Sequence, residues 1–109
     1  MKLENIPFQT TDWARIEATE HAGLTGKAVW RTQQCGEVRV RIVEYSAGYV
    51  ADHWCEKGHI LFCLEGELET ALGDGRRFVL TAGMSYQVAD HEAPHRSASK
   101  SGARLFVVD

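Results

Sequence analysis

The sequence lacks a surplus of basic charge. Its 12 Lys and Arg residues are outnumbered by 15 Asp and Glu residues, and the formal net charge is -3. The basic residues are scattered, and the only adjacent pair is Arg76–Arg77, beside an expected turn. A nucleic-acid-binding surface requires clustered basic side chains or a recognisable motif. We therefore expect no nucleic-acid partner.

Long apolar runs are also missing. The first residues, Met1-Lys2-Leu3-Glu4-Asn5, lack the apolar core of a signal peptide, and no stretch reaches the length of a membrane span. We expect no membrane partner and a cytoplasmic location. The cysteines Cys35, Cys55 and Cys63 are odd in number, which argues against a disulfide framework and leaves free thiols, buried thiols or metal ligands.

Proline and long helical periodicity are scarce, whereas glycine is frequent. Two prolines and ten glycines occur, and the glycines separate short β-branched and aromatic runs, a pattern typical of an all-β fold. With 109 residues, 44% of them hydrophobic, the chain is expected to form a single domain over residues 1–109. Eight or nine short antiparallel strands would form a jelly roll or small barrel. An immunoglobulin-like sandwich competes, but its paired Cys and central Trp spacing is missing.

The clearest strand is Glu37–Tyr45, in which Arg39, Arg41 and Val43 share one face. Gly66 is expected to separate two strands, Gly73-Asp74-Gly75 to form a hairpin turn, and Thr11–His21 to hold a short helix. A polar loop is expected between the last two strands. The other strands are predicted at Lys27–Arg31, His59–Leu64, Glu67–Leu72, Arg77–Leu80, Met84–Val88 and Arg104–Val108.

Potential metal ligands gather in the stretch from Gly48 to His59. His53 and Cys55 are two residues apart, so in extended chain both side chains face one side. His59 follows Gly58, where the chain can turn into the next strand. Imidazole and thiolate are favoured ligands of borderline-soft divalent metals. A further ligand would have to come from a distant strand, and His95 offers one.

The spacing of these residues resembles the first motif of the cupin superfamily. That motif runs Gly, five residues, His-x-His, three or four residues, Glu, six residues, Gly. Here Gly48 is followed after four residues by His53-x-Cys55, after three more by His59, and after six by Gly66. Cys55 thus stands in place of the second His, and His59 in place of the Glu. Both substitutions keep a metal-ligating side chain.

The second cupin motif is matched more loosely. After Gly83 come five residues, Ala89-x-His91, three residues, His95, three residues and Ser99. The run Ala93-Pro94-His95-Arg96 is similar to the end of this motif in small bacterial cupins. Asp52-His53-Trp54-Cys55 is similar to the signature of an uncharacterised group of small cupins named for Asp-His-Cys-Trp. The resemblance implies a cupin-type double-stranded β-helix with metal ligands at His53, Cys55, His59 and His95.

A thiolate with three imidazoles favours zinc first, then Fe(II), nickel or copper. An open coordination position would allow a metal-dependent enzyme, such as an oxygenase, that acts on a small molecule. A closed four-ligand site would instead indicate a non-enzymatic metal or small-ligand binder, or a sensor. A barrel without metal is the third hypothesis. No acid–base pair is evident, because nothing in the sequence places Glu56 or Glu92 over a metal.

Other residues receive more ordinary interpretations. Cys63 alternates with His59 and Leu61, so it should be a small buried hydrophobe inside the barrel, with a second thiol near the metal as the alternative. Cys35 is expected in a turn, His91 in a solvent-exposed loop, and Tyr86 in the core or a pocket wall. His21 receives no role.

Two further interpretations stay open. Arg39 and Arg41 are either solvated or face the barrel interior toward an anionic ligand, and Asp52 either orients a ligand or caps a turn. The strand His59–Leu64 is apolar on both faces, because Ile60, Phe62 and Leu64 alternate with the inward residues. We therefore predict a homodimer.

Overall fold

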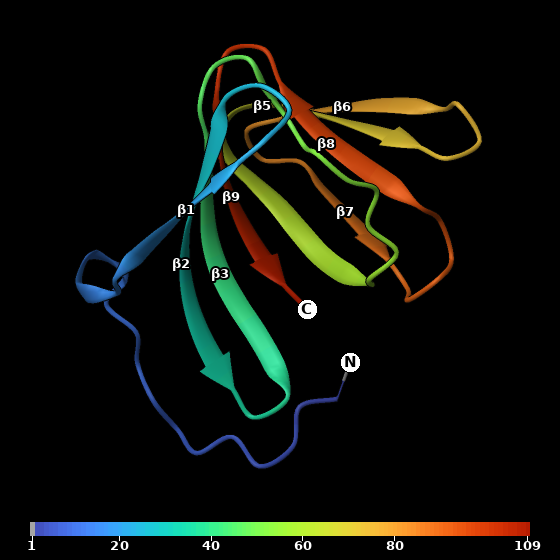
Figure 1. Ribbon diagram of the computed structural model, residues 1–109. Coiled ribbons are helices and arrows are strands. Elements are labelled where there is room, and N and C mark those ends of the chain that lie inside the picture. The colour runs from blue at the N-terminus through green and yellow to red at the C-terminus, as the bar shows by residue number, and fades with distance from the viewer. Residues whose placement is uncertain (1) are drawn as a thin grey trace.

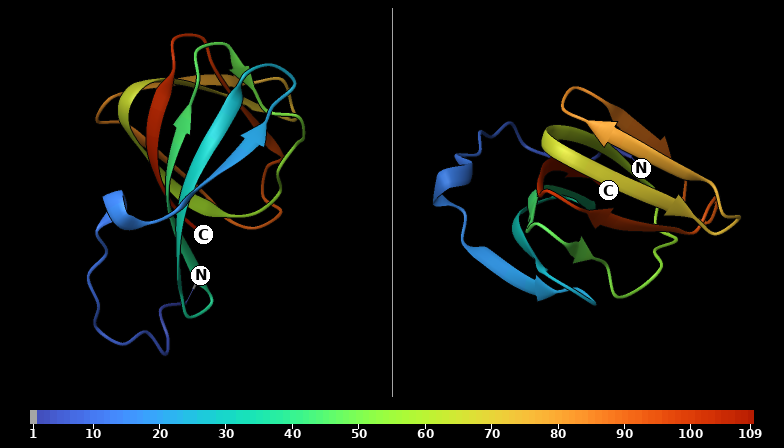
Figure 2. Two further views of the ribbon diagram at one scale, coloured as in Figure 1. Left: turned by 60° about the vertical axis from the view of Figure 1, so that its left-hand side comes forward. Right: turned by 90° about the horizontal axis from the view of Figure 1, so that it is seen from above.

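The computed structural model describes residues 2–109, which form nine strands in one antiparallel sheet that curls into a barrel (Figures 1 and 2). A single 3-10 turn, η1, lies at Trp13–Arg15. The strands are β1 (Ala18–Ala22), β2 (Lys27–Cys35), β3 (Val38–Tyr45), β4 (Tyr49–Val50), β5 (His59–Leu72), β6 (Arg77–Thr81), β7 (Ser85–Val88), β8 (His95–Ser99) and β9 (Ala103–Val108). The all-β barrel expected from the sequence is confirmed.

The long strand β5 organises the barrel. The sheet order is β1-β2-β3-β9-β5-β8-β4, and β6 and β7 both pair with β5 as well. The first half of β5 pairs with β7 and β9, whereas its second half pairs with β6 and β8. A register shift between Cys63 and Glu65 marks the change of partners. One strand therefore belongs to both walls of the barrel.

Gly66 does not end a strand, contrary to the sequence prediction. It lies within β5 at a φ of +78°, and a Cβ there would collide with the backbone carbonyl of Gly102. Glycine is needed because it tolerates this conformation and allows the two backbones to approach closely. The residue thus bends a continuous strand where two strands separated by a turn were expected.

The interior is lined by alternate residues of the strands. Leu61 and Cys63 from β5 and Leu105 and Val107 from β9 are all at most 3% exposed. The prediction that Cys63 is a buried small hydrophobe is confirmed, since its exposure is 0%. Strand alternation therefore places Cys63 and His59 on the same inner face of β5.

Three short strands, β1, β4 and β8, were missed. The predicted helix over Thr11–His21 consists of only the η1 turn, and residues 18–22 form β1. The predicted polar loop before β9 contains β8, which pairs with β4 and β5. The described residues contain no helix long and apolar enough to cross a membrane.

Candidate functional site

The two motif stretches meet inside the barrel. His59 is the first residue of β5 and His95 the first residue of β8. The loop before β5 is attached to the start of β8 by two backbone hydrogen bonds. Cys55 N donates to His95 O at 2.8 Å, and His95 N donates to Cys55 O at 2.9 Å. Residues that lie 40 positions apart are therefore held side by side by backbone hydrogen bonds.

His59 and His95 form a buried imidazole pair. Their ring centroids lie 4.7 Å apart at an interplanar angle of 81°, and the residues are 9% and 3% exposed. His95 Nδ1 lies 2.8 Å from the carbonyl oxygen of Ala93. A carbonyl only accepts hydrogen bonds, so Nδ1 carries the proton and Nε2 presents a lone pair. That Nε2 is buried without a partner among the described residues.

Tyr86 from β7 completes a cluster with the two imidazoles. Its hydroxyl lies 2.7 Å from His59 Nε2. Burial, together with the neighbouring His95, lowers the pKa of His59 to about 4. Burial also raises the pKa of the Tyr86 phenol. The imidazole of His59 is therefore neutral and the phenol protonated near neutral pH.

His53 is not brought into this cluster. Its side chain is 72% exposed, and Nδ1 lies 2.6 Å from Asp52 Oδ1. The spacing argument for His53 and Cys55 assumed an extended chain, but residues 52–53 form a bend. Cys55 is half-buried with a free thiol. Asp52 thus orients the imidazole of His53.

A second polar network lies beside the imidazole pair. Arg39 donates from Nε and Nη2 to the two carboxylate oxygens of Asp109 at 2.9 Å, and Arg41 Nη2 donates to Asp109 Oδ2 at 3.2 Å. Arg41 is 7% exposed and its guanidinium lies 4.5 Å from the centre of the Trp30 ring. The open question about the two arginines is thus answered by an ion-pair network, which turns Arg41 inward.

Asp109 is a site residue that the sequence reasoning missed. Its side chain is 2% exposed. Burial raises its pKa, but the hydrogen bond and charge of Arg39 and the charge of Arg41 outweigh burial, so the net pKa lies below its ordinary value. The signal was present, since Asp109 continues the inward alternation of Leu105 and Val107. Two arginines on the inner face require a neighbouring negative charge, and Asp109 is the inward acidic residue that supplies it.

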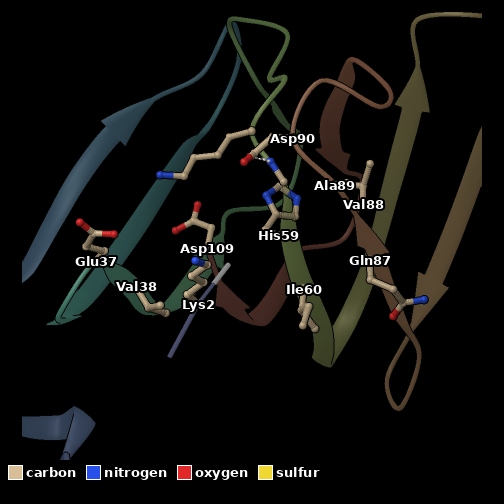
Figure 3. Close-up of a pocket in the computed structure, with 12 residues that line it drawn as sticks. Lys2, Glu37, Val38, His59, Ile60, Gln87, Val88, Ala89, Asp90 and Asp109 are labelled. Atoms are coloured by element: carbon tan, nitrogen blue, oxygen red, sulfur yellow. Dashed lines mark hydrogen bonds between the residues drawn. The ribbon is translucent and has the colours of Figure 1, made fainter. Parts of the chain in front are cut away.

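Two cavities reach the imidazole pair. The larger, which we call the outer mouth, has a volume of about 990 Å³ and is lined among others by His59, Asp109, Lys57 and Lys2. Figure 3 shows His59, at the start of β5, and Asp109, directly after β9, facing this space. The smaller, which we call the inner cavity, has a volume of about 190 Å³. It is lined by Thr70, Leu72, Phe78, Tyr86, Gln87, Val88, Ala93 and His95.

Comparison with solved structures identifies the architecture. An RmlC-like cupin from Shewanella frigidimarina superposes with a TM-score of 0.72 at 21% identity, covering 94% of this chain and 90% of the other. The chain has the cupin fold. This confirms the fold expected from the motifs, which share only part of the cupin pattern. No protein-family model and no curated protein matches the sequence.

Enzymes occur among the structures with this cupin fold. Ectoine synthase from P. lautus matches with a TM-score of 0.75 at 18% identity, covering 93% of this chain and 76% of the enzyme. The protein Fe(II)-HppE, solved with an alternative substrate, matches with a TM-score of 0.75 at 17% identity, covering 97% of this chain and 60% of the other. At these identities the similarity establishes the fold alone.

The side chains of this cupin barrel fit a metal ion only in part. No group of three or more His, Cys, Asp and Glu side chains is arranged to hold a metal within residues 2–109. Two of the four predicted ligands, His59 and His95, do converge, and the lone pair of His95 Nε2 is free to bind. Cys55 is attached to His95 through the backbone. His95 thus offers a free lone pair to a metal, whereas His59 Nε2 would have to leave Tyr86 and His53 would have to leave Asp52 to join it.

Proposed function

We propose that this cupin-fold protein binds one divalent transition metal per chain through His53, Cys55, His59 and His95, and that the site serves a small molecule. The observation that carries the proposal is the lone pair of His95 Nε2, which is buried and unpartnered within the described part of the chain. A buried polar atom without a partner is costly, and a metal ion would satisfy it. The hydrogen bond from Nδ1 to Ala93 O fixes the tautomer that metal binding requires.

Zinc is the metal we expect first, with Fe(II), nickel or copper as alternatives. Imidazole nitrogen and thiolate sulfur are the preferred ligands of these ions. A bound ion would supply Lewis-acid or redox chemistry. The neutral imidazole of His59 needs no deprotonation, because burial lowers its pKa to about 4.

An open site is favoured over the closed four-ligand alternative. Both cavities reach the imidazole pair, the outer mouth at His59 and the inner cavity at His95. The side chain of His53 faces solvent, 72% exposed, so an ion held first by Cys55, His59 and His95 would keep one coordination position open to a small molecule until His53 joins them. We therefore favour a metal-dependent enzyme over a sensor with a closed site.

The test is elemental analysis of protein expressed without a histidine tag. We expect about one transition-metal ion per chain, and strong loss of metal in His59→Ala and His95→Ala. His91→Ala is the matched control, because His91 lies in the exposed loop before β8. Protein that stays metal-free after incubation with zinc, iron, nickel and copper would overturn the proposal.

Cobalt substitution tests the thiol separately. Cobalt(II) bound by Cys55 would give a thiolate charge-transfer band, and Cys55→Ala would remove that band. Cys35→Ala is the control, since Cys35 lies at the end of β2. An unchanged band in Cys55→Ala would remove Cys55 from the ligand set, and His53→Ala with full metal content would remove His53.

We also propose that the protein is a cytoplasmic homodimer. In the single chain Ile60 and Phe62 are 49% and 39% exposed on the outer face of β5. Neighbouring apolar side chains in such a position are typical of an interface. The free state of all three thiols in residues 2–109 is compatible with a reducing compartment.

A further inference from the structure

The two imidazoles of the proposed metal site differ in how ready they are to bind an ion. His95 Nε2 is buried and has no hydrogen-bond partner in residues 2–109. His59 Nε2, by contrast, lies 2.7 Å from the hydroxyl of Tyr86, although the two imidazole rings are neighbours with centroids 4.7 Å apart. One nitrogen is therefore free, and the other is occupied by a phenol.

The phenol and a metal ion exclude each other at His59. An imidazole nitrogen has a single in-plane position, which takes either a hydrogen bond or a metal. A zinc–nitrogen bond measures about 2.0–2.1 Å, shorter than the 2.7 Å that separates His59 Nε2 from the Tyr86 oxygen. An ion at this nitrogen would thus collide with the phenol. The Tyr86 hydroxyl has to leave Nε2 before His59 can bind a metal.

A second partner for the phenol lies next to it. Thr70 on β5 is 3% exposed, and its hydroxyl makes no hydrogen bond of good geometry in residues 2–109. It is nevertheless close enough to act on Tyr86: burial raises the pKa of the phenol, and the Thr70 hydroxyl opposes that rise. A threonine hydroxyl both donates and accepts hydrogen bonds. Thr70 Oγ1 can therefore bind the phenol when it leaves His59.

The inner cavity gives the Tyr86 ring space to move. Protein interiors are close-packed, so a buried ring shifts easily only where it adjoins free volume. Tyr86 and Thr70 both line the inner cavity, whose volume is about 190 Å³. Tyr86 belongs to the four-residue strand β7, which is paired with β5 alone among the strands of residues 2–109. A small shift of this side chain needs no rearrangement of the barrel.

We propose that Tyr86 is a positioning residue that controls metal entry, with its hydroxyl on His59 Nε2 in the metal-free protein and on Thr70 Oγ1 once an ion is bound. The inference rests on the proposed metal site and adds two residues that are not ligands. The two hydrogen bonds act in opposite directions, because the bond to His59 disfavours metal binding and the bond to Thr70 favours it. An ion meets His95 first, and His59 joins when Tyr86 releases it.

The experiment measures the zinc affinity of the EDTA-treated full chain by competition with a chromophoric chelator. Tyr86→Phe should bind zinc about threefold tighter, because no phenol hydroxyl has to be displaced. Thr70→Val should bind zinc about fivefold more weakly, because the displaced hydroxyl finds no partner. The double variant should match Tyr86→Phe, since Thr70 then has no hydroxyl to hold.

Tyr45→Phe is the matched control. It removes the hydroxyl of another partly buried tyrosine, whose phenol lies near Ser97, and it should leave the zinc affinity unchanged. A general loss of packing would weaken zinc binding in both single variants, so the opposite signs are specific to the proposed exchange of partners. Circular dichroism checks that each variant folds, and if Thr70→Val does not fold, the sign of the change in Tyr86→Phe decides alone.

Unchanged or weaker zinc binding in Tyr86→Phe would overturn the role of Tyr86 and leave the metal site standing. A double variant as weak as Thr70→Val would also overturn it, because Thr70 would then act without the phenol. Zinc uptake by Tyr86→Phe but not by wild type would support the inference. Absence of zinc binding in every form, wild type included, would overturn the metal proposal and this inference together.

Discussion

Replacing Asp109 by asparagine removes the negative charge that neutralises two inward arginines while preserving the shape of the side chain. The carboxylate accepts two hydrogen bonds from Arg39 at 2.9 Å and one from Arg41 at 3.2 Å. Arg41 is only 7% exposed, so its charge cannot be rehydrated without opening the barrel. We expect Asp109→Asn to lower the free energy of unfolding strongly.

The magnitude follows from the burial of the pair. Removing one partner of a buried ion pair costs about 3–5 kcal/mol, and the lower end applies because the asparagine oxygen still accepts one bond. At about 2.1 cal/mol/K per residue, a chain of 109 residues unfolds with an entropy of roughly 0.23 kcal/mol/K. A loss of about 3 kcal/mol therefore lowers Tm by about 13 °C. Thermal and urea unfolding followed by circular dichroism measure both quantities.

The same strand pair supplies a matched control. Glu44 on β3 and Arg104 on β9 form an exposed ion pair at 3.4 Å, with side chains 46% and 40% exposed. Glu44→Gln should cost less than about 1 kcal/mol. Adding Arg41→Met to Asp109→Asn should restore part of the stability, because it removes the unpaired buried charge. Equal losses in Asp109→Asn and Glu44→Gln would refute the reasoning.

Three other predictions concern pH, backbone conformation and assembly. The ion pairs hold the pKa of Asp109 below its ordinary value of 3.8, so the stability that Asp109 contributes is complete above that pH and is lost as the pH falls through the folded-state pKa. In urea unfolding below about pH 4, the free energy of unfolding should therefore fall less steeply with decreasing pH in Asp109→Asn than in wild type. Equal slopes would contradict this. Gly66→Ala should cost about 3 kcal/mol, because a Cβ collides with a backbone carbonyl of the β8–β9 turn, whereas Gly75→Ala, at a φ of +94° in open space, should cost about 1 kcal/mol. Similar values for the two glycines, measured by urea unfolding, would show that close approach is unimportant. Ile60→Asp should convert the proposed dimer to monomer in light scattering, whereas Val79→Asp, at a similarly exposed apolar position of β6, should not; a wild-type monomer would end the dimer proposal.

Much of the barrel was predictable because apolar alternation along a strand reports directly which face is buried. The pattern in β3, β5 and β9 was sufficient to place Leu61 and Cys63 on the inner face. β8 was missed because it lacks this apolar alternation. Its residues, His95–Ser99, have no apolar alternation, and they are extended because β4 and β5 supply backbone partners.

The candidate site was predictable only in part. The sequence motifs correctly indicated that His95 lies beside the 53–59 stretch, which backbone hydrogen bonds to Cys55 confirm. The ligand role of all four residues stays a prediction. The position of His53 was not predictable, because two-residue spacing defines a common face only in extended chain, and the chain bends there.

The amino-acid sequence by itself determined the strand alternation, the buried thiol of Cys63 and the two motif stretches from which the site is built. These features depend on local periodicity and spacing, which can be read along the chain. Tertiary structure alone decided which polar atoms have partners. The Arg41–Asp109 ion pair spans 68 residues, and the free lone pair of His95 Nε2 depends on Ala93 holding the opposite nitrogen inside a closed barrel. Hydrogen-bond satisfaction in a buried space depends on the packing of distant strands, which no local pattern records.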